Sequence, residues 1–275
     1  MKTRSRASTV CEAEGHLLLV RLRDPSSRVE AFYPPGGGIE PNEAPVEAAR
    51  REALEETGLR VVVDPASELV EVYPFNWNAT DYEVTTHYFF AKLDEPFSLE
   101  TPKVVDADYH LGAKWLPTNE ALDALAVNPA IGAAVARLLN KRHRSTWEKH
   151  PRIHGSPAAT LLGIHDQFRM AARRVTTEPR FFRPLANVLH HHHHAEEAML
   201  FPFIARQTGK APSRLVDDHG ELTRAIDLAE NEPTPDNLSR FASVLEAHLD
   251  REELHVIPVL LAIDPREAWD MIHGG

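Results

Sequence analysis

The pattern of apolar and polar residues differs between the two halves of the chain. In the first half, runs at 17–23, 59–63 and 84–93 are apolar or alternating, and β-branched and aromatic residues are enriched in them. Such runs, separated by turn residues, are typical of strands. A helical pattern at 45–57 lies between them, and a later strand leads into a helix near Thr118. The alternation predicts an α/β (α+β) sandwich.

The second half shows helical periodicity and no strand pattern. Four helical stretches between 158 and 263 are separated by turn-forming residues at Pro179, 209–213 and 231–237. They predict an all-α four-helix bundle, followed by a short helix at 265–272.

The segment 141–157 is charged, contains Pro and Gly and lacks a period, so we interpret it as a linker. The expected organisation is therefore a sandwich domain at 1–140, this linker, and a helical domain at 158–275.

Composition and charge limit the function further. The chain has 275 residues, of which 43% are hydrophobic, enough for two domains with buried cores. A net charge of −11 argues against binding of duplex nucleic acid. No apolar run is long enough for a transmembrane helix, and no signal peptide is recognisable, so no membrane partner is expected. The single Cys11 excludes a disulfide framework, and we expect a cytoplasmic location.

A glycine run and a carboxylate-rich helix occupy residues 32–59. Gly36–Gly38 can let a phosphate approach the backbone closely, while Pro45 and Gly58 suit the two ends of a helix. An ordinary Glu-rich helix has a solvated acidic face, but the joint pattern of glycine run, spaced glutamates and glycine cap favours a phosphate site.

Three glutamates of this helix, Glu52, Glu55 and Glu56, are spaced so that they converge on one sector. Such a cluster is costly unless cations neutralise it, and its hard oxygen donors suit Mg²⁺ or Mn²⁺. Arg51 is placed to hold Glu43 across the start of the helix.

This stretch resembles the Nudix box, in which glycine, five residues, Glu and seven residues precede Arg-Glu-x-x-Glu-Glu-x-Gly and an apolar residue. The matching residues are Gly37, Glu43, Arg51, Glu52, Glu55, Glu56, Gly58 and Leu59; Ala53 stands where a larger aliphatic residue is commoner. The resemblance implies a pyrophosphohydrolase acting on a nucleoside diphosphate derivative, with Glu52, Glu55 and Glu56 as Mg²⁺ ligands. Arg51 and Glu43 are then catalytic residues, and Gly37 and Gly38 contact the substrate.

Two features outside the box bear on the reaction. Family members recruit a further acid from a loop, for which the candidates here are Glu100, Asp106 and Asp108. The aromatic residues of 73–82 could stack on a base, but we favour a structural role within the sandwich.

The histidine run at 190–194 is not an affinity tag, because its surroundings are repeated. The segment from His192 to Pro202 and that from His248 to Pro258 share His-x-x-x-Glu-Glu and the Pro, at a separation of 56 positions. The helical domain is therefore predicted to be a repeated helical hairpin.

Heptad spacing places one His, then a His-x-x-x-Glu pair, on the inward seam of each hairpin. Each of these histidines alone could be a hydrogen-bonded core residue, but six such groups in one layer favour a dinuclear iron site. The six residues are His165, His192, Glu196, His219, His248 and Glu252.

The second half resembles the hemerythrin-like HHE cation-binding domains, which implies a di-iron centre held by these six residues. Thr223 occupies the position of an extra histidine in oxygen-carrying hemerythrins, which speaks against reversible oxygen carriage of their kind. O₂, peroxide or NO are then candidate ligands of the iron. The other histidines of the run, His190, His191, His193 and His194, are expected to be partly exposed, with His193–Glu197 as an alternative, out-of-register pair.

These observations predict a Mg²⁺-dependent Nudix pyrophosphohydrolase fused to a di-iron domain that senses iron, oxygen or redox state. The alternative is an iron- or gas-binding protein whose Nudix domain binds a nucleotide without turnover. A third interpretation makes the bundle a structural element or one that forms a homodimer.

Overall fold

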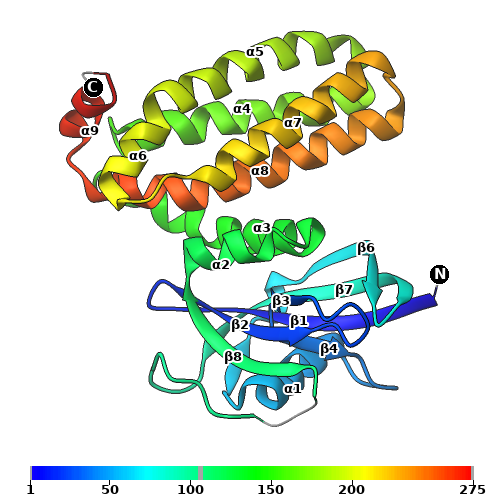
Figure 1. The fold of residues 1–275 in the computed structure, drawn as a ribbon. Helices are drawn as coiled ribbons and strands as arrows, with labels where there is room; N and C mark the ends of the chain where they lie inside the picture. The colour runs from blue at the N-terminus through cyan, green and yellow to red at the C-terminus, as the bar shows by residue number, and fades with distance from the viewer. Residues whose placement is uncertain (1, 105–107, 274–275) are drawn as a thin grey trace. The chain divides into compact units, whose positions relative to one another are not determined.

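The computed structural model describes residues 2–104 and 108–273, and the chain divides into two compact units, Met1–Leu139 and Asn140–Gly275 (Figure 1). The division lies within helix α3 (Pro129–Trp147). Residues 141–147, which we expected to be linker, are therefore the last turns of this helix. Their Lys, Arg and Ser side chains obscure a helical pattern whose inward positions Asn140 and Trp147 are buried.

The first unit contains a mixed sheet of eight described strands. Its main path runs through β3 (Glu30–Tyr33), β2 (His16–Arg23), β1 (Lys2–Ala13), β7 (Thr80–Leu93) and β5 (Val61–Val63). Beside this path, β4 (Gly36–Gly38) pairs with β1, β6 (Leu69–Trp77) with β7, and β8 (His110–Pro117) with β2.

Strand β1 joins the two parts of this sheet. Most of its length pairs in parallel with β7, with Arg6 opposite Thr86, whereas its last two residues pair with β2 in antiparallel fashion. A short 3₁₀ turn (Pro65–Ser67) connects β5 to β6. The mixed sheet with its helices confirms the predicted α/β sandwich.

Helix α1 (Pro45–Thr57) has the bounds that its punctuation predicts. Pro45 begins the helix, and Gly58 ends it with a φ of 70°, which lets its N–H donate to the Leu54 carbonyl. The small buried residues Ala48, Ala49 and Ala53 let the helix pack closely on the sheet. Helix α2 (Thr118–Leu125) follows β8 directly, as expected.

The second unit is a helical bundle, which confirms the predicted fold class. Its long helices are α4 (Pro157–Thr177), α5 (Phe182–Ala195), α7 (Ser213–Asn231) and α8 (Pro235–Ala262). A 3₁₀ turn (Pro179–Phe181) precedes α5, a π-helical turn η3 (Glu196–Leu200) joins α5 to α6 (Phe201–Thr208), and α9 (Pro265–His273) comes last.

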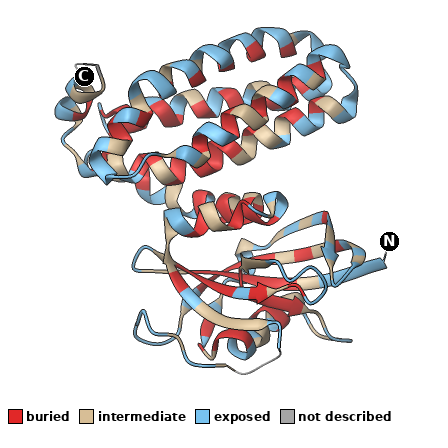
Figure 2. Cartoon of the chain, in the orientation of Figure 1, coloured by how far each residue is buried: buried red, intermediate tan, exposed pale blue. Residues whose placement is uncertain are grey.

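Buried positions form stripes on the facing sides of the bundle helices (Figure 2). One end of the bundle is an apolar core that includes Phe168, Phe182 and Phe241. Next to it the inward positions are histidines and carboxylates, and beyond this polar layer the buried residues are again apolar, among them Phe203, Leu215 and Leu260. No helix in the described part of the chain is both long and apolar enough to cross a membrane.

Candidate metal centres

The glycine strand β4 lies against the glutamates of α1. Gly36 N–H donates to Glu56 at 2.8 Å, and a Cβ at Gly36 would lie 2.4 Å from the Ala7 carbonyl oxygen. A Cβ at Gly37 would lie 2.3 Å from the Glu52 carboxylate. Gly36 and Gly37 are therefore required because protein atoms approach closely, and these glycines do not use positive φ angles.

Arg51 connects the parts of this site. Its guanidinium binds both oxygens of Glu43, at 2.8 and 2.9 Å, and also donates to the Gly38 carbonyl. The same group donates to Glu52 and Glu55. Its hydrogen bonds hold the pKa of Glu43 at about 2. Arg51 thus fixes the loop before α1 relative to the helix face.

The three glutamates differ in their surroundings. Glu56 is buried, Glu52 is half-buried, and Glu55 is exposed. Burial raises the pKa of Glu52. The three glutamates are among the described residues, but their carboxylate oxygens do not all lie within 4.8 Å of one another. They share one helix face, with Arg51 between Glu52 and Glu55 and with Glu56 turned toward Gly36.

A cavity of about 230 Å³ opens beside Glu52 and Glu56. Strands β1, β7 and β6 each supply alternate residues to it, because every second side chain of a strand points to the same face. From β1 these include Arg4 and Arg6, which the sequence interpretation missed. From β6 they include Phe75 and Trp77, so the aromatic residues of 73–82 line a cavity as well as packing within the sheet.

The candidate acids outside the Nudix box do not reach this cavity in the described residues. Glu100 and Asp108 are exposed and are not among its lining residues. Asp106 lies outside the described residues.

The six seam residues of the bundle come together as expected, each from its own place in the repeat. Together with His193 they form two groups, in each of which the ligand atoms lie within 4.8 Å of one another, and Glu196 belongs to both. One group consists of His165, His192, Glu196 and Glu252, and the other of His193, Glu196, His219 and His248.

The two carboxylates each face histidines of both groups. Glu196 lies 2.7 Å from His192 Nε2 and 3.4 Å from His219 Nε2. Glu252 lies 3.4 Å from the Nε2 atoms of His165 and of His248. Each carboxylate thus lies between histidines of the two groups, where its oxygens could help to hold a metal ion.

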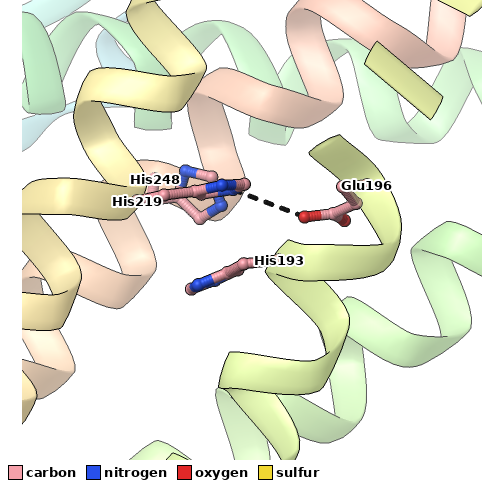
Figure 3. Close-up of side chains that lie close together, drawn as sticks. All are labelled: His193, Glu196, His219 and His248. Atoms are coloured by element: carbon pink, nitrogen blue, oxygen red, sulfur yellow. Dashed lines mark ion pairs between the residues drawn. The ribbon is translucent and has the colours of Figure 1, made fainter. Parts of the chain in front are cut away.

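His193 is the residue that the sequence interpretation misplaced. It is 5% exposed rather than on the surface, and its ring stacks on that of His219 at a centroid distance of 4.0 Å. Figure 3 shows His193 beside Glu196, His219 and His248. The other members of the run, His190, His191 and His194, are exposed as expected.

A bundle helix has two neighbouring helices, so its buried sector is wider than one heptad seam. His192 and His193 differ by about 100° around α5. His192 faces His165 of α4 and His193 faces His219 of α7. The π-helical turn that follows has more residues per turn than an α-helix, which shifts the inward positions. Met199, seven residues after His192 and on the same face of a regular α-helix, is therefore exposed.

The buried polar atoms at this centre contact one another but make no other hydrogen bond with the described residues. They are the Nε2 atoms of all five histidines and both oxygens of Glu196 and Glu252. Burial lowers the pKa of His192 to about 4 and that of His193 to about 2, so both are neutral. Burial alone would lower the pKa values of His165 and His248, but the neighbouring Glu252 helps to raise both to about 9. Buried imidazoles and carboxylates that contact only one another fit a metal centre, because coordination would satisfy them.

The outer nitrogens of two histidines are held by carboxylates, and a carboxylate lies near that of a third without a hydrogen bond. Glu253 accepts from His165 Nδ1 at 3.0 Å, and Glu197 accepts from His219 Nδ1 at 2.7 Å. Asp218 lies 3.9 Å from His248 Nδ1. These contacts turn the Nε2 atoms inward, as carboxylates commonly do for metal-ligating histidines.

Glu197 and Glu253 explain the repeated Glu-Glu pair. In each repeat the first glutamate faces the metal centre, and the second binds the lone histidine of the other hairpin. The sequence interpretation considered Glu197 only in an alternative pair with His193 and assigned no role to Glu253, although the repetition of the Glu-Glu pair was the signal. Thr223 is turned away from the centre, since its hydroxyl donates to the His219 carbonyl.

Comparisons with known proteins agree with both sites. The NUDIX domain model matches residues 1–138, and the Hemerythrin HHE cation binding domain model matches residues 165–260. The chain belongs to the NUDIX family and is a hydrolase acting on pyrophosphate bonds, with a hemerythrin HHE domain in its helical half. Both family resemblances read from the sequence are confirmed.

Solved structures that are similar to about half of this chain include hydrolases. A NUDIX hydrolase from Nitrosomonas europaea is 23% identical over 52% of this chain and 90% of its own, with a TM-score of 0.39. An Ap4A hydrolase from C. elegans is 20% identical over 52% of this chain and 98% of its own, with a TM-score of 0.40. Likeness at this level carries no argument about the substrate. No curated protein matches the chain.

Proposed function

We propose that the first unit hydrolyses a nucleoside diphosphate derivative with Mg²⁺ or Mn²⁺ held by Glu52, Glu55 and Glu56. The observation that carries this proposal is the placement of Glu52 and Glu56 against the glycine strand, at the edge of a cavity that also holds Arg4 and Arg6. Carboxylates and guanidinium groups beside one cavity suit a substrate whose phosphates are bridged by cations.

Within this site, the metal would activate a water and stabilise the charge of the leaving phosphate. The protein side chains hold the parts of the site in place. Arg51 holds Glu43 and Gly38 together, so that the loop before α1 and strand β4 keep one geometry. The backbone of Gly37 and Gly38 leaves room for a phosphate beside the carboxylates.

Substitution of Glu56 by Gln tests hydrolysis against mere nucleotide binding. Loss of a metal ligand removes several kcal/mol of transition-state stabilisation, so we expect the hydrolysis rate to fall about 1,000-fold or more. Glu47→Gln is the matched control, because Glu47 lies on the same helix but pairs only with Arg50 in the described contacts. A Glu56→Gln protein that keeps its rate would contradict the proposal, and a wild type that binds nucleotides without turnover would support the rival function.

We propose further that the bundle holds two iron ions, with His193 added to the six predicted ligands. Five imidazoles and two carboxylates form a mixed nitrogen and oxygen donor set that suits iron in a bundle core. The sequence predicted four histidine ligands, because Thr223 occupies the position of an extra histidine. With His193 the number of histidines is five. The test is iron content and the absorption spectrum of protein prepared with iron and without histidine-affinity resin. About two irons per chain are expected, and none would refute the assignment.

The regulatory part of the proposal is that O₂, NO, peroxide or the redox state of the iron biases the hydrolase. Coupling requires that the bundle have two states that interact differently with the catalytic unit. The measurement is the hydrolysis rate of the oxidised, reduced and iron-free protein at the same Mg²⁺ concentration. Equal rates in the three forms would exclude the sensing role and leave the hydrolase intact.

A further inference from the structure

The cavity beside the glutamates has a charged end and an aromatic end. Arg4 and Arg6 lie on β1, and Phe75 and Trp77 lie two strands away on β6. Phe75 pairs with Tyr82 and Arg4 with Val84, so with strands about 4.8 Å apart and about 3.3 Å per residue the backbones at Phe75 and Arg4 are about 12 Å apart, while Trp77 and Arg6 lie farther apart. Strand β4 and the glutamates lie beyond β1. The order across the sheet is therefore aromatic rings, guanidinium groups, carboxylates.

The aromatic end is a surface formed by two parallel rings. The rings of Phe75 and Trp77 are parallel within 11°, with centroids 6.3 Å apart. Tyr33 and Tyr109 meet Trp77 edge-on, at 6.5 and 5.8 Å, and so restrain its ring. Both Phe75 and Trp77 remain partly accessible. Such a surface suits the face of a planar heterocycle.

The turn of the β6–β7 hairpin, which carries these rings, is tied to the rest of the unit. The turn between β6 and β7 has positive φ angles at Asn78 and Ala79, and Asn78 N–H donates to Asp24 at 2.6 Å. Asp24 also accepts from Ser26 and Ser27 in its own loop. The aromatic surface is thus held in place before any ligand arrives.

The charged end holds two like charges close together. Burial and the neighbouring Arg6 lower the pKa of Arg4. Arg6 donates to the Gly36 carbonyl, and the Arg4 guanidinium lies above Gly38, 4.0 Å from where a Cβ would stand. A phosphate at this position would relieve the repulsion and would lie next to the glutamates.

The hydroxyl groups deepest in the cavity are already paired. Tyr73 bonds with Tyr88 at 3.0 Å and with Thr86 at 2.9 Å, and Ser8 donates to the Pro35 carbonyl. Among the described residues that line the cavity there is no Asn, Gln, Asp or His. These side chains commonly read base edges, and the other charged readers in the cavity, Arg4, Arg6, Glu52 and Glu56, lie at the charged end. The aromatic end therefore presents a face for a base but few groups to distinguish its edge.

Resting on the proposed hydrolase function, we infer that the substrate class is nucleoside diphosphate derivatives of any base. The base lies on the Phe75–Trp77 surface, and Arg4 with Arg6 binds the phosphates. Recognition by ring face is tolerant of base identity, because every base has such a face. Selectivity then comes from the phosphates and from the group attached to them.

The experiment measures binding without turnover, by calorimetry of the full-length protein with Mg²⁺. The probes are the α,β-methylene analogues of ADP, GDP, UDP and CDP, in which the bridging oxygen is replaced and hydrolysis at that bond is blocked. We expect the four affinities to fall within about 100-fold, with the purines tighter, since larger rings stack better. A spread of 100-fold or more would overturn the inference, because it requires hydrogen bonds to base edges.

Two variants test the aromatic surface. Trp77→Leu keeps an apolar side chain but removes the ring, and we expect all four affinities to fall about 5- to 150-fold. Trp77→Phe keeps a ring and should lose less than about 5-fold. Val72→Ala, on the outward face of the same strand, is the control and should bind like wild type. Unchanged affinity in Trp77→Leu would overturn the inference.

Arg4→Ala tests the charged end. It should weaken the diphosphate analogues about 10-fold or more and leave the binding of adenosine unchanged; equal effects on both would contradict the phosphate assignment. Failure here is separable from failure of the proposed function. A wild type that hydrolyses its substrate while Trp77→Leu binds normally refutes only the base site. If Trp77→Leu weakens binding as expected but the wild type shows no Mg²⁺-dependent hydrolysis, only the proposed hydrolase function is refuted.

Discussion

Replacement of Glu253 by Gln should destabilise the bundle even without metal. The Glu253 side chain is fully buried and accepts hydrogen bonds from His165, Arg169 and Asn140 at 3.0, 2.6 and 2.8 Å. A second guanidinium, that of Arg144, lies 3.3 Å away. Gln retains the shape, but it has one oxygen in place of two and carries no charge.

The magnitude follows from these contacts. Breaking a buried ion pair by removing one partner costs about 3–5 kcal/mol of unfolding free energy. Arg169 still pairs with Asp250 at 2.8 Å, which reduces the loss of unfolding free energy. The amide NH₂ of Gln, however, faces at least one donor, and that donor then lacks an acceptor. We therefore expect a loss of about 3 kcal/mol. For a unit of this size that lowers the unfolding temperature by about 10 °C.

The assay is differential scanning calorimetry of the metal-free, full-length protein. The bundle transition is identified as the one that shifts when iron is added. Asp166→Asn is the matched control, because Asp166 pairs with the same Arg144 at 2.7 Å but is 53% exposed, which limits its contribution to less than about 1 kcal/mol. If Glu253→Gln shifts the transition no more than Asp166→Asn does, the reasoning from buried charge is wrong.

Three further outcomes are expected. His193→Ala should lower the iron content from about two toward one per chain, whereas His194→Ala, at an exposed neighbour, should keep two; equal contents would remove His193 from the ligand set. Burial raises the pKa of the Cys11 thiol to about 12, so iodoacetamide at pH 8 should label native protein at least about 100-fold more slowly than free cysteine, as followed by mass spectrometry. Hydrogen bonds from Ser27 and Asn78 hold the pKa of Asp24 well below its usual range, so Asp24 stabilises the fold above its unfolded-state pKa of about 4 and loses this effect as the pH falls further. Asp24→Ala should lower the unfolding temperature of the first unit at pH 7, and the difference from wild type should shrink below pH 4; a constant difference would contradict this.

The sequence pattern predicted those features well that depend on residues close together in the chain. Helix α1 has the bounds that Pro45 and Gly58 suggest, because helix ends depend on capping groups within a few residues. The repeated His-x-x-x-Glu pairs place their ligands on inward faces, because spacing along a helix sets direction around its axis. In both cases the cause lies within one or two turns of chain.

Local pattern failed where a second neighbour or a long-range contact decided the outcome. The heptad seam of α5 predicted His192 but not His193, because a seam describes packing against one partner and α5 contacts two. The π-helical turn at Glu196–Leu200 has no recognisable sequence signal, and it moved Met199 to the surface. The sequence interpretation gave the aromatic residues of 73–82 a structural role, and it missed that Phe75 and Trp77 share a cavity with Arg6.

By itself, the sequence determined the chemistry of this protein: the family of its first half, the carboxylate helix, and the repeated donors of its second half. These follow from residue type and from spacing along single helices. Only the tertiary structure decided which histidines meet, that Glu197 and Glu253 hold the histidines of the opposite hairpin, and that Arg4 and Arg6 lie beside the glutamates. Those outcomes depend on strand register and helix packing between residues far apart in the chain, and neither leaves a signal in short stretches of sequence.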